Sequence, residues 1–126
     1  MLRLLEEESL VEASAAKGAR LRALLDERLV DHPRVGEIRG RGLMIGLELV
    51  ADRETRAPFP RAARITEAVV REARARGVLV YSGTGLADGT DGDSILLGPP
   101  FVVTDVELGT IARVVSEAVR EGTTSA

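Results

Sequence analysis

Few residues of this chain offer covalent or acid–base chemistry. Lys17 is the only lysine, so any reaction through a Schiff base would have to use it. Activation of such a lysine requires burial or a neighbouring cation. The residues one helical turn away, Ala13, Ser14, Arg20 and Leu21, give little sign of a pocket. A solvated position on a helix is therefore the favoured interpretation of Lys17.

His32 is the only histidine and follows the expected first helix. A cationic imidazole is favourable at a helix C-terminus, and no second histidine or recognisable nucleophile accompanies it for catalysis. The chain has no cysteine, which excludes disulfides, thiolate metal sites and cysteine nucleophiles. We therefore predict no catalytic residue and no metal site on this chain.

Two glycine-rich segments are candidate binding elements. The stretch from Gly83 to Asp93 could cradle a phosphate, but no helix follows it and its acids would repel the anion. It also lacks the full ligand pattern of a calcium loop, so a polar connection is favoured. In the other segment, Arg39 and Arg41 flank a glycine. They could clamp a carboxylate, or stay solvated and weakly paired with acids such as Glu37 and Glu48.

Composition narrows the class of protein. The chain has 126 residues, of which 44% are hydrophobic, which is enough for one domain with a modest core. Its formal charge of -3, with acids and bases mixed along the chain, gives no basic face for nucleic acid. No segment has the length of a membrane span or of a signal-peptide apolar region. We expect a cytoplasmic protein that binds neither nucleic acid nor membrane.

Hydrophobic periodicity predicts the elements that position these residues. A helix should begin at Leu2 and end at Val30, and its Gly18 marks either close approach by another element or a tolerated small residue. The other expected elements are strands over 35–39 and 43–50 around a turn at 40–42, a helix over 61–76 with Gly77 as its C-cap, strands over 78–81 and 94–97 around a loop at 82–93, and a last helix followed by a polar tail from Gly122.

Side-chain patterns define the faces of these elements. The last helix should start from a capping box of Thr104 and Glu107. Apolar stripes are expected at Leu21, Leu24, Leu25 and Leu29, at Val11, Ala15 and Ala19, at Leu43, Ile45, Leu47 and Leu49, at Ile65, Ala68, Val69 and Ala73, and at Leu108, Ile111, Val115 and Ala118. The predicted fold class is α+β: a small antiparallel-rich sheet of about four strands covered by three helices on one face.

Two motifs carry a family resemblance. They are VGEIRGRGLMIGLELV at residues 35–50 and RGVLVYSGTGLADGTDGDSILLGPPFVVTDVEL at residues 76–108. In this order and spacing they resemble the C-terminal small domain of class III aminotransferases. These are pyridoxal-phosphate enzymes of fold type I that include omega-aminotransferases and ornithine aminotransferase. The resemblance extends over nearly the whole of residues 1–126, which we interpret as one small domain.

The resemblance implies a division of labour. In the family, a large domain supplies the Schiff-base lysine, the aspartate facing the pyridine nitrogen and the phosphate-binding backbone. Lys17 matches none of these, so this chain is expected to be inactive alone and to hold no pyridoxal phosphate by itself. Its expected partner is the missing large domain, or a second copy in a homodimer through the first helix. A free-standing interaction or regulatory module is the alternative function.

The resemblance also suggests which residues lie near the substrate in the intact enzyme. These are Tyr81, Gly83, Gly85, Leu86, Leu96, Pro99 and Pro100. Relatives that bind an α-carboxylate carry an arginine at the position of Leu96, and an aliphatic side chain cannot form that bidentate contact. The long loop from Ser82 further resembles the omega-aminotransferase branch. The amino donor and acceptor stay open.

Overall fold

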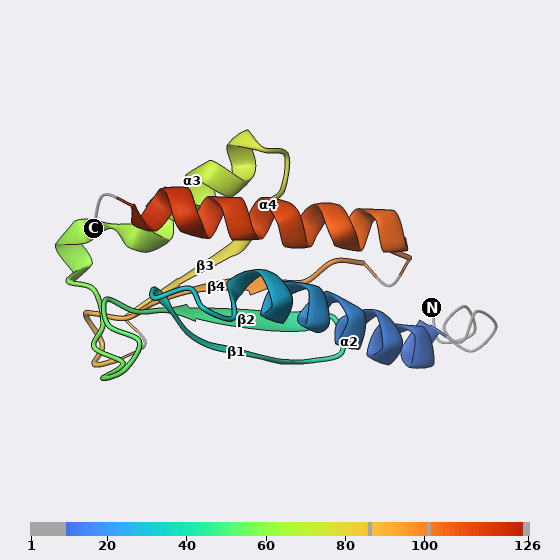
Figure 1. Ribbon diagram of the computed structural model, residues 1–126, viewed down its shortest axis with the longest axis horizontal. Helices are drawn as coiled ribbons and strands as arrows, with labels where there is room; N and C mark the ends of the chain where they lie inside the picture. Colours follow the sequence, from blue (N-terminus) through green and yellow to red (C-terminus); the bar gives the residue numbers. More distant parts are fainter. Residues whose placement is uncertain (1–9, 86, 101, 125–126) are drawn as a thin grey trace.

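A sheet with helices on one face forms the fold of this chain, seen in a computed structural model that describes residues 10–85, 87–100 and 102–124 (Figure 1). The elements are α2 (Leu10–Leu29), β1 (Val35–Arg41), β2 (Met44–Leu49), the 3-10 turn η1 (Arg61–Ala63), α3 (Ile65–Ala75), β3 (Tyr81–Thr84), β4 (Asp93–Leu97) and α4 (Asp105–Thr123). No helix in these ranges is long and apolar enough to cross a membrane.

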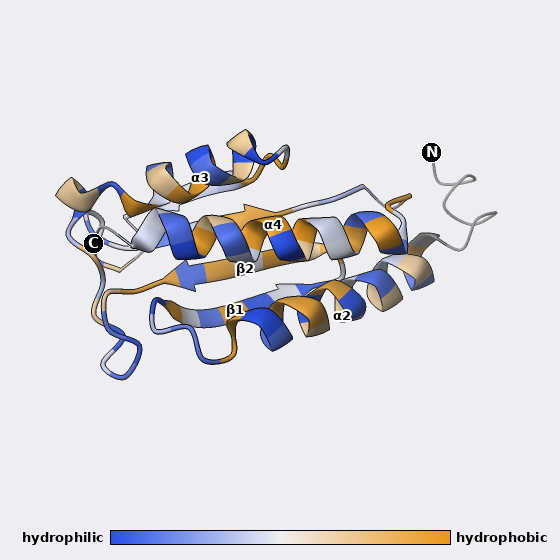
Figure 2. Ribbon diagram, turned by 45° about the horizontal axis from the view of Figure 1, so that its top comes forward, coloured by the Kyte–Doolittle hydropathy of each residue, from blue (hydrophilic) through white to orange (hydrophobic). Residues whose placement is uncertain are grey.

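The four strands lie in the order β1-β2-β4-β3, and each neighbouring pair is antiparallel. Helix α2 packs over β1 and β2, and α3 packs over β3 and β4. Helix α4 lies between the other two helices and contacts both (Figure 2). The predicted class, an antiparallel sheet covered by three helices, is confirmed.

The core lies between the sheet and the helices because side chains alternate along each strand. In β2, Ile45, Leu47 and Leu49 face the helices and are buried, as the apolar pattern predicts. The helices contribute the matching apolar side chains, namely Leu21, Leu25 and Leu29 from α2, Ile65, Val69 and Ala73 from α3, and Leu108, Ala112, Val115, Ala118 and Val119 from α4. The other face of the sheet has no helix over it among the described residues.

Gly18 marks a close approach of α2 to the β1–β2 turn. A Cβ atom at Gly18 would lie 1.9 Å from the carbonyl oxygen of Gly42, which no side chain allows. Gly42 itself has a φ of 55°, which a tight turn demands of glycine. Before this contact, Val11 and Ala15 are exposed. The expected residues 2–9 of the helix lie outside the described residues.

The strand expected over 78–81 is wrong. Helix α3 instead ends in a glycine cap, where Gly77 donates its N–H to Arg74 and Val78 donates to Ala73, both at 3.0 Å. The chain then runs outward, leaving Leu79 81% exposed. Strand β3 starts at Tyr81 because only Tyr81–Thr84 lie opposite β4. The first residues of the loop expected over 82–93 therefore belong to β3.

The helix expected over 61–76 starts later than predicted. Arg64 has a φ of 53°, a left-handed conformation that separates η1 from α3. The caps come from a distant loop, since Asp91 Oδ1 accepts the N–H of Arg61 at 2.8 Å. Asp93 Oδ1 likewise accepts the N–H of Thr66, in the first turn of α3, at 3.0 Å.

The last helix begins as predicted and ends later. Thr104 Oγ1 accepts the N–H of Glu107 at 3.2 Å, and Glu107 Oε1 accepts the N–H of Thr104 at 2.9 Å, which confirms the capping box. The expected polar tail is wrong at its start, because Gly122 is buried within α4. A Cβ there would lie 2.9 Å from the backbone of Val69, so the glycine lets α4 pack against α3.

Candidate functional site

The uncovered face of the sheet carries several side chains that could bind a ligand. Strand register aligns Arg39 with Gly46, Gly46 with Leu96, and Leu96 with Tyr81. Residues directly opposite in a sheet point to the same face. These four residues, which we call the arginine row, therefore cross the uncovered face from β1 to β3.

A second row lies beside the arginine row. It runs from Glu37 to Glu48, Ser94 and Gly83. Each row contains a glycine, Gly46 in the first and Gly83 in the second, and the absence of a side chain there leaves a depression. A groove of about 270 Å³ runs along the two rows. Its polar lining comes from Arg39, Glu48, Tyr81, Ser82 and Ser94, and its apolar lining includes Leu96.

The charges of this face are held loosely. Glu37 Oε2 lies 3.7 Å from Arg39 Nη1 and 3.6 Å from Arg56 Nη1. The side chains of Arg39 and Arg56 are 64% and 58% exposed, and such exposed pairs contribute about 0–1 kcal/mol. The sequence-based interpretation, in which Arg39 is solvated or weakly paired with acids such as Glu37, agrees with this long and exposed contact. Arg41 lies at the turn, opposite Met44.

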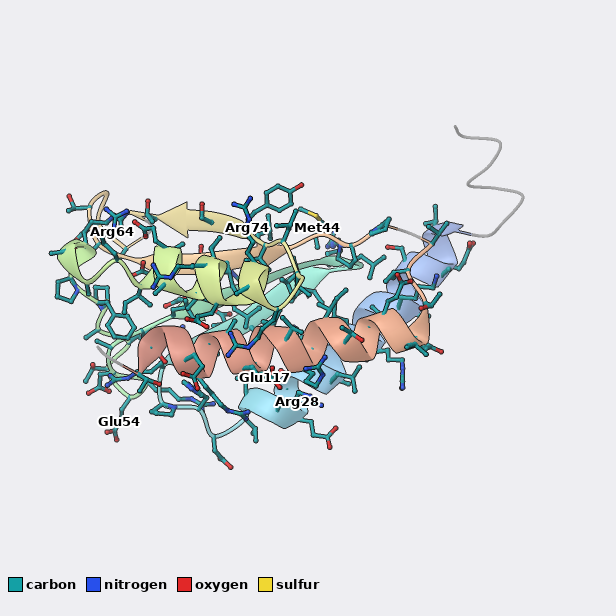
Figure 3. The ribbon with its side chains drawn as sticks, turned by 90° about the horizontal axis from the view of Figure 1, so that it is seen from above. Arg28, Met44, Glu54, Arg64, Arg74 and Glu117 are labelled. Carbon is teal, nitrogen blue, oxygen red and sulfur yellow. The ribbon has the colours of Figure 1, made fainter. Side chains whose placement is uncertain are left out.

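The structure brings together only part of the set expected near the substrate. Tyr81, Gly83 and Leu96 lie on the uncovered face. Pro99 and Pro100 follow β4 at one end of the sheet, where they line a separate apolar groove of about 400 Å³ together with Tyr81 and other residues. Met44 lies at this end as well (Figure 3), and a Cβ atom built on Gly98 would lie 3.4 Å from its sulfur atom. Leu86 lies outside the described residues.

Gly85 begins a closed loop and lines neither of these two grooves. Its N–H bonds to Gly92 at 2.9 Å, and its carbonyl accepts the N–H of Gly89 at 2.8 Å. Asp88 Oδ1 accepts the N–H groups of Thr90 and Asp91 at 2.9 and 2.7 Å. The bond from Asp91, with that from Thr90, lowers the pKa of Asp88.

These bonds leave the loop amides little capacity for an anion, which supports the interpretation as a polar connection. Within the described ranges, no group of three or more His, Cys, Asp or Glu side chains is placed to hold a metal ion.

A buried carboxylate that sequence reasoning missed connects the loop to α3. Asp93 is 3% exposed and accepts both the N–H and the hydroxyl of Thr66, the latter at 2.6 Å. The Thr66 hydroxyl also lies 3.2 Å from the carbonyl oxygen of Gly83. The two residues are 27 positions apart, so no local motif reveals the pair.

His32 has a structural place at the end of α2. Its Nδ1 accepts the N–H of Arg34 at 3.1 Å. Partial burial, followed by the charges of Arg120, Arg34 and Arg53, lowers the pKa of His32. The neutral imidazole is therefore favoured, and the expectation of a cationic cap is not supported by its surroundings.

Arginines supply the positive charge at this helix end instead. Arg120 donates to the carbonyl of Arg28 at 2.9 Å, and Arg53 donates to the carbonyl of Val30. Cations are favoured near the last carbonyls of a helix.

Lys17 lies on α2, in the helical layer and away from the groove. The pKa of Glu107 is lowered first by the hydrogen bond from the Thr104 N–H, and the charge of Lys17 adds to this effect. Lys17 therefore lies near the start of α4. Its helix, α2, packs on the covered face of the sheet, whereas the groove lies on the opposite, uncovered face.

Comparison with known proteins identifies the family. A model of aminotransferase class-III matches residues 1–119. The chain is 38% identical over 119 residues to the uncharacterized aminotransferase YodT of Bacillus subtilis, covering 94% of this chain and 27% of that protein. It is 43% identical over 114 residues to the adenosylmethionine-8-amino-7-oxononanoate aminotransferase of Nitratidesulfovibrio vulgaris, covering 90% of this chain and 19% of the relative.

Solved structures give the same result. A thermostable omega transaminase variant from Pseudomonas jessenii superposes with a TM-score of 0.83 at 35% identity, over 98% of this chain and 26% of that one. The fold and the matches define a part of a transaminase. This chain belongs to the class III aminotransferases, and it spans about a quarter of the length of the curated relatives it matches.

The family implies pyridoxal phosphate in the whole enzyme, and the described residues do not fit that cofactor. The one lysine lies in the helical layer, and the glycine-rich loop uses its amides internally and carries acids.

Proposed function

We propose that this chain is the small domain of a pyridoxal-phosphate-dependent aminotransferase, which transfers an amino group between an amine or amino acid and a keto acid. One observation supports this most. The chain matches a relative along 94% of its own length yet spans 27% of that relative, while its only lysine, Lys17, lies on α2 and is not among the residues that line the groove. The chain is then inactive alone and acts with a larger, cofactor-binding part of the enzyme in the cytoplasm.

The uncovered sheet face is the surface that this larger part would cover. It holds a groove with both apolar and charged lining, as a substrate cleft requires. Tyr81, Gly83 and Leu96 would line the cleft, and Gly85, Pro99 and Pro100 would lie at its margins.

Leu96 bears on the choice of amino donor. Its side chain lies in the middle of the arginine row, where it offers apolar contact and no hydrogen bond. A donor without an α-carboxylate fits this position better than a glutamate-like donor. The intact enzyme should therefore prefer simple amines.

Cofactor trapping tests the assignment. The purified chain is mixed with pyridoxal phosphate, reduced with borohydride and analysed by mass spectrometry. We expect no stoichiometric adduct, because Lys17 lies away from the groove. A specific adduct at Lys17 in a chain that also transaminates an amine would show an autonomous enzyme and overturn the proposal.

A second copy of the chain is the other proposed partner. Val11, which is 63% exposed, and Ala15 give the first described turns of α2 an exposed apolar side, and contiguous apolar surface tends to associate. We expect a homodimer through α2, detected by light scattering at rising concentration. A monomer at every concentration would contradict this part of the proposal.

A further inference from the structure

An exposed cation and an empty strand position lie together on the uncovered face. Arg39 extends from the edge strand β1, and Gly46 is the next residue of the arginine row. Because Gly46 has no side chain, nothing stands between Arg39 and Leu96 along this row. Neighbouring strands lie about 4.8 Å apart, so Leu96 is about 10 Å from Arg39 across the sheet.

The space above Gly46 is open. A Cβ atom built there would meet nothing closer than 3.9 Å, and its nearest atoms are the carbonyl oxygens of Arg39 and Ile95 and the Cδ1 atom of Leu96. The long side chain of Arg39 can therefore lie over Gly46 toward Leu96. The groove of about 270 Å³ contains all three of these positions, Arg39, Gly46 and Leu96.

Arg39 can leave its present partner without stranding a charge. Its contact with Glu37 is long, at 3.7 Å, and its side chain is 64% exposed. Arg56 contacts the same carboxylate oxygen at 3.6 Å and remains there when Arg39 moves. The cost of releasing Arg39 is accordingly small.

We propose that Arg39, reaching over Gly46, binds the carboxylate of the keto-acid substrate in the groove beside Leu96. This proposal rests on the proposed function, and it makes Arg39 a residue that determines substrate specificity. An amino acceptor of this kind carries a carboxylate, and Leu96 cannot bind it. A guanidinium can bind it with two parallel N–H···O bonds. Leu96 then contacts the apolar part of either substrate.

Glu48 sets the limit of this site. It lies in the neighbouring row, two residues along β2 from Gly46, which is about 7 Å in a strand. Its negative charge opposes a bound carboxylate at that distance, whereas Arg39 contacts the carboxylate directly. Removal of the Glu48 charge should therefore tighten binding.

The test reads binding on the whole 126-residue chain without cofactor. The ¹⁵N-labelled chain is titrated with pyruvate at constant ionic strength, and with pyruvamide, which is similar in shape but uncharged. Pyruvate should shift the amide signals of Gly46, Tyr81 and Leu96, and pyruvamide should not. Arg39→Gln should weaken pyruvate binding about fivefold, as expected for an exposed charged contact. Glu48→Gln should strengthen it.

Arg41→Gln is the matched control, since Arg41 lies on the same strand at the turn and should leave the affinity unchanged. Gly46→Val is a second variant that fills the path of Arg39 and should abolish the shifts while the remaining spectrum stays folded. The proposal is overturned if pyruvate shifts no signal on this face, if Arg39→Gln or Gly46→Val binds like the original, or if Arg41→Gln loses as much affinity as Arg39→Gln.

These results are independent of the enzymatic assignment. Loss of the Arg39 effect would leave the aminotransferase role in place. Failure of a larger, cofactor-loaded enzyme to transaminate would refute the proposed function without changing the binding measurement.

Discussion

Replacement of Gly18 by alanine is the sharpest test of how the two layers meet. Alanine in place of glycine within a helix adds about 1 kcal/mol of stability by propensity alone. Here the added Cβ would lie 1.9 Å from the carbonyl oxygen and 2.3 Å from the carbonyl carbon of Gly42. These are backbone atoms that cannot rotate away, so α2 and the β1–β2 turn must separate.

Overpacking of this kind costs about 1–3 kcal/mol or more. The approach of 1.9 Å to a backbone oxygen indicates the upper part of this range, about 2–3 kcal/mol. Less the gain of about 1 kcal/mol in propensity, Gly18→Ala should lower the free energy of unfolding by about 1–2 kcal/mol. Gly109→Ala is the matched control in α4, because a Cβ there meets nothing within 4 Å, and it should raise the free energy by up to about 1 kcal/mol.

Urea unfolding followed by circular dichroism measures both changes. Gly122→Ala, whose Cβ would lie 2.9 Å from the Val69 backbone, should behave like Gly18→Ala. If Gly18→Ala is stabilised as much as Gly109→Ala, then α2 does not approach the turn as described and the reasoning is refuted.

Three further outcomes are expected. Asp93→Ala leaves the buried N–H of Thr66 without an acceptor and leaves the Thr66 hydroxyl only the carbonyl oxygen of Gly83. It should lower the free energy of unfolding, measured in urea, by about 2–3 kcal/mol. Alanine in place of the exposed Asp88 should cost about 1 kcal/mol or less, and equal effects would contradict the capping role of Asp93. His32 has a lowered pKa in the fold, so the unfolded chain binds its proton more readily. Stability linked to His32 is present above its unfolded pKa of 6.5 and declines as the pH falls through that value. His32→Gln should flatten this part of the stability profile, and an unchanged slope would show that His32 is not its source. Thr104→Ala removes the capping-box hydroxyl and should lower the unfolding free energy by about 1 kcal/mol, with Thr90→Ala in the loop as a control expected to change little.

Local signals in the sequence predicted much of the fold. The alternation along β2 identified which of its residues are buried, because a strand places every second side chain on one face. The Thr104 and Glu107 pair located the start of α4, since both halves of a capping box lie within one turn. Gly77 likewise located the end of α3, because a helix often ends at a glycine with positive φ, which is also a local signal.

The errors arise where structure depends on distant residues. The first turn of α3 is capped by Asp93, which lies 27 residues after Thr66, and no local pattern reports such a pair. Strand β3 begins at Tyr81 because of its register with β4, although Val78 and Val80 have the more strand-like side chains.

The candidate site shows the same division. The resemblance predicts that Tyr81 and Leu96 lie near the substrate, and this stays a prediction; the structure shows that both residues line one groove. The alignment of Arg39 with Gly46 and Leu96 follows from the pairing of three strands, which single-sequence patterns do not give. The sequence alone indicates Arg39 only as one of two arginines that flank a glycine in an expected turn.

The central claim is that the uncovered sheet face lines the substrate cleft of an aminotransferase. Its most direct test is a chimera in which this chain replaces the matching 27% of YodT, loaded with pyridoxal phosphate. The ratio of turnover with glutamate to turnover with a simple alkylamine is measured for the chimera, for Leu96→Arg and for the control Val30→Arg, whose exposed position lies at the end of α2. We predict that the chimera prefers the amine, that Leu96→Arg shifts the ratio toward glutamate, and that Val30→Arg does not. A folded, cofactor-loaded chimera that already prefers glutamate, or whose ratio Leu96→Arg leaves unchanged, would contradict the account.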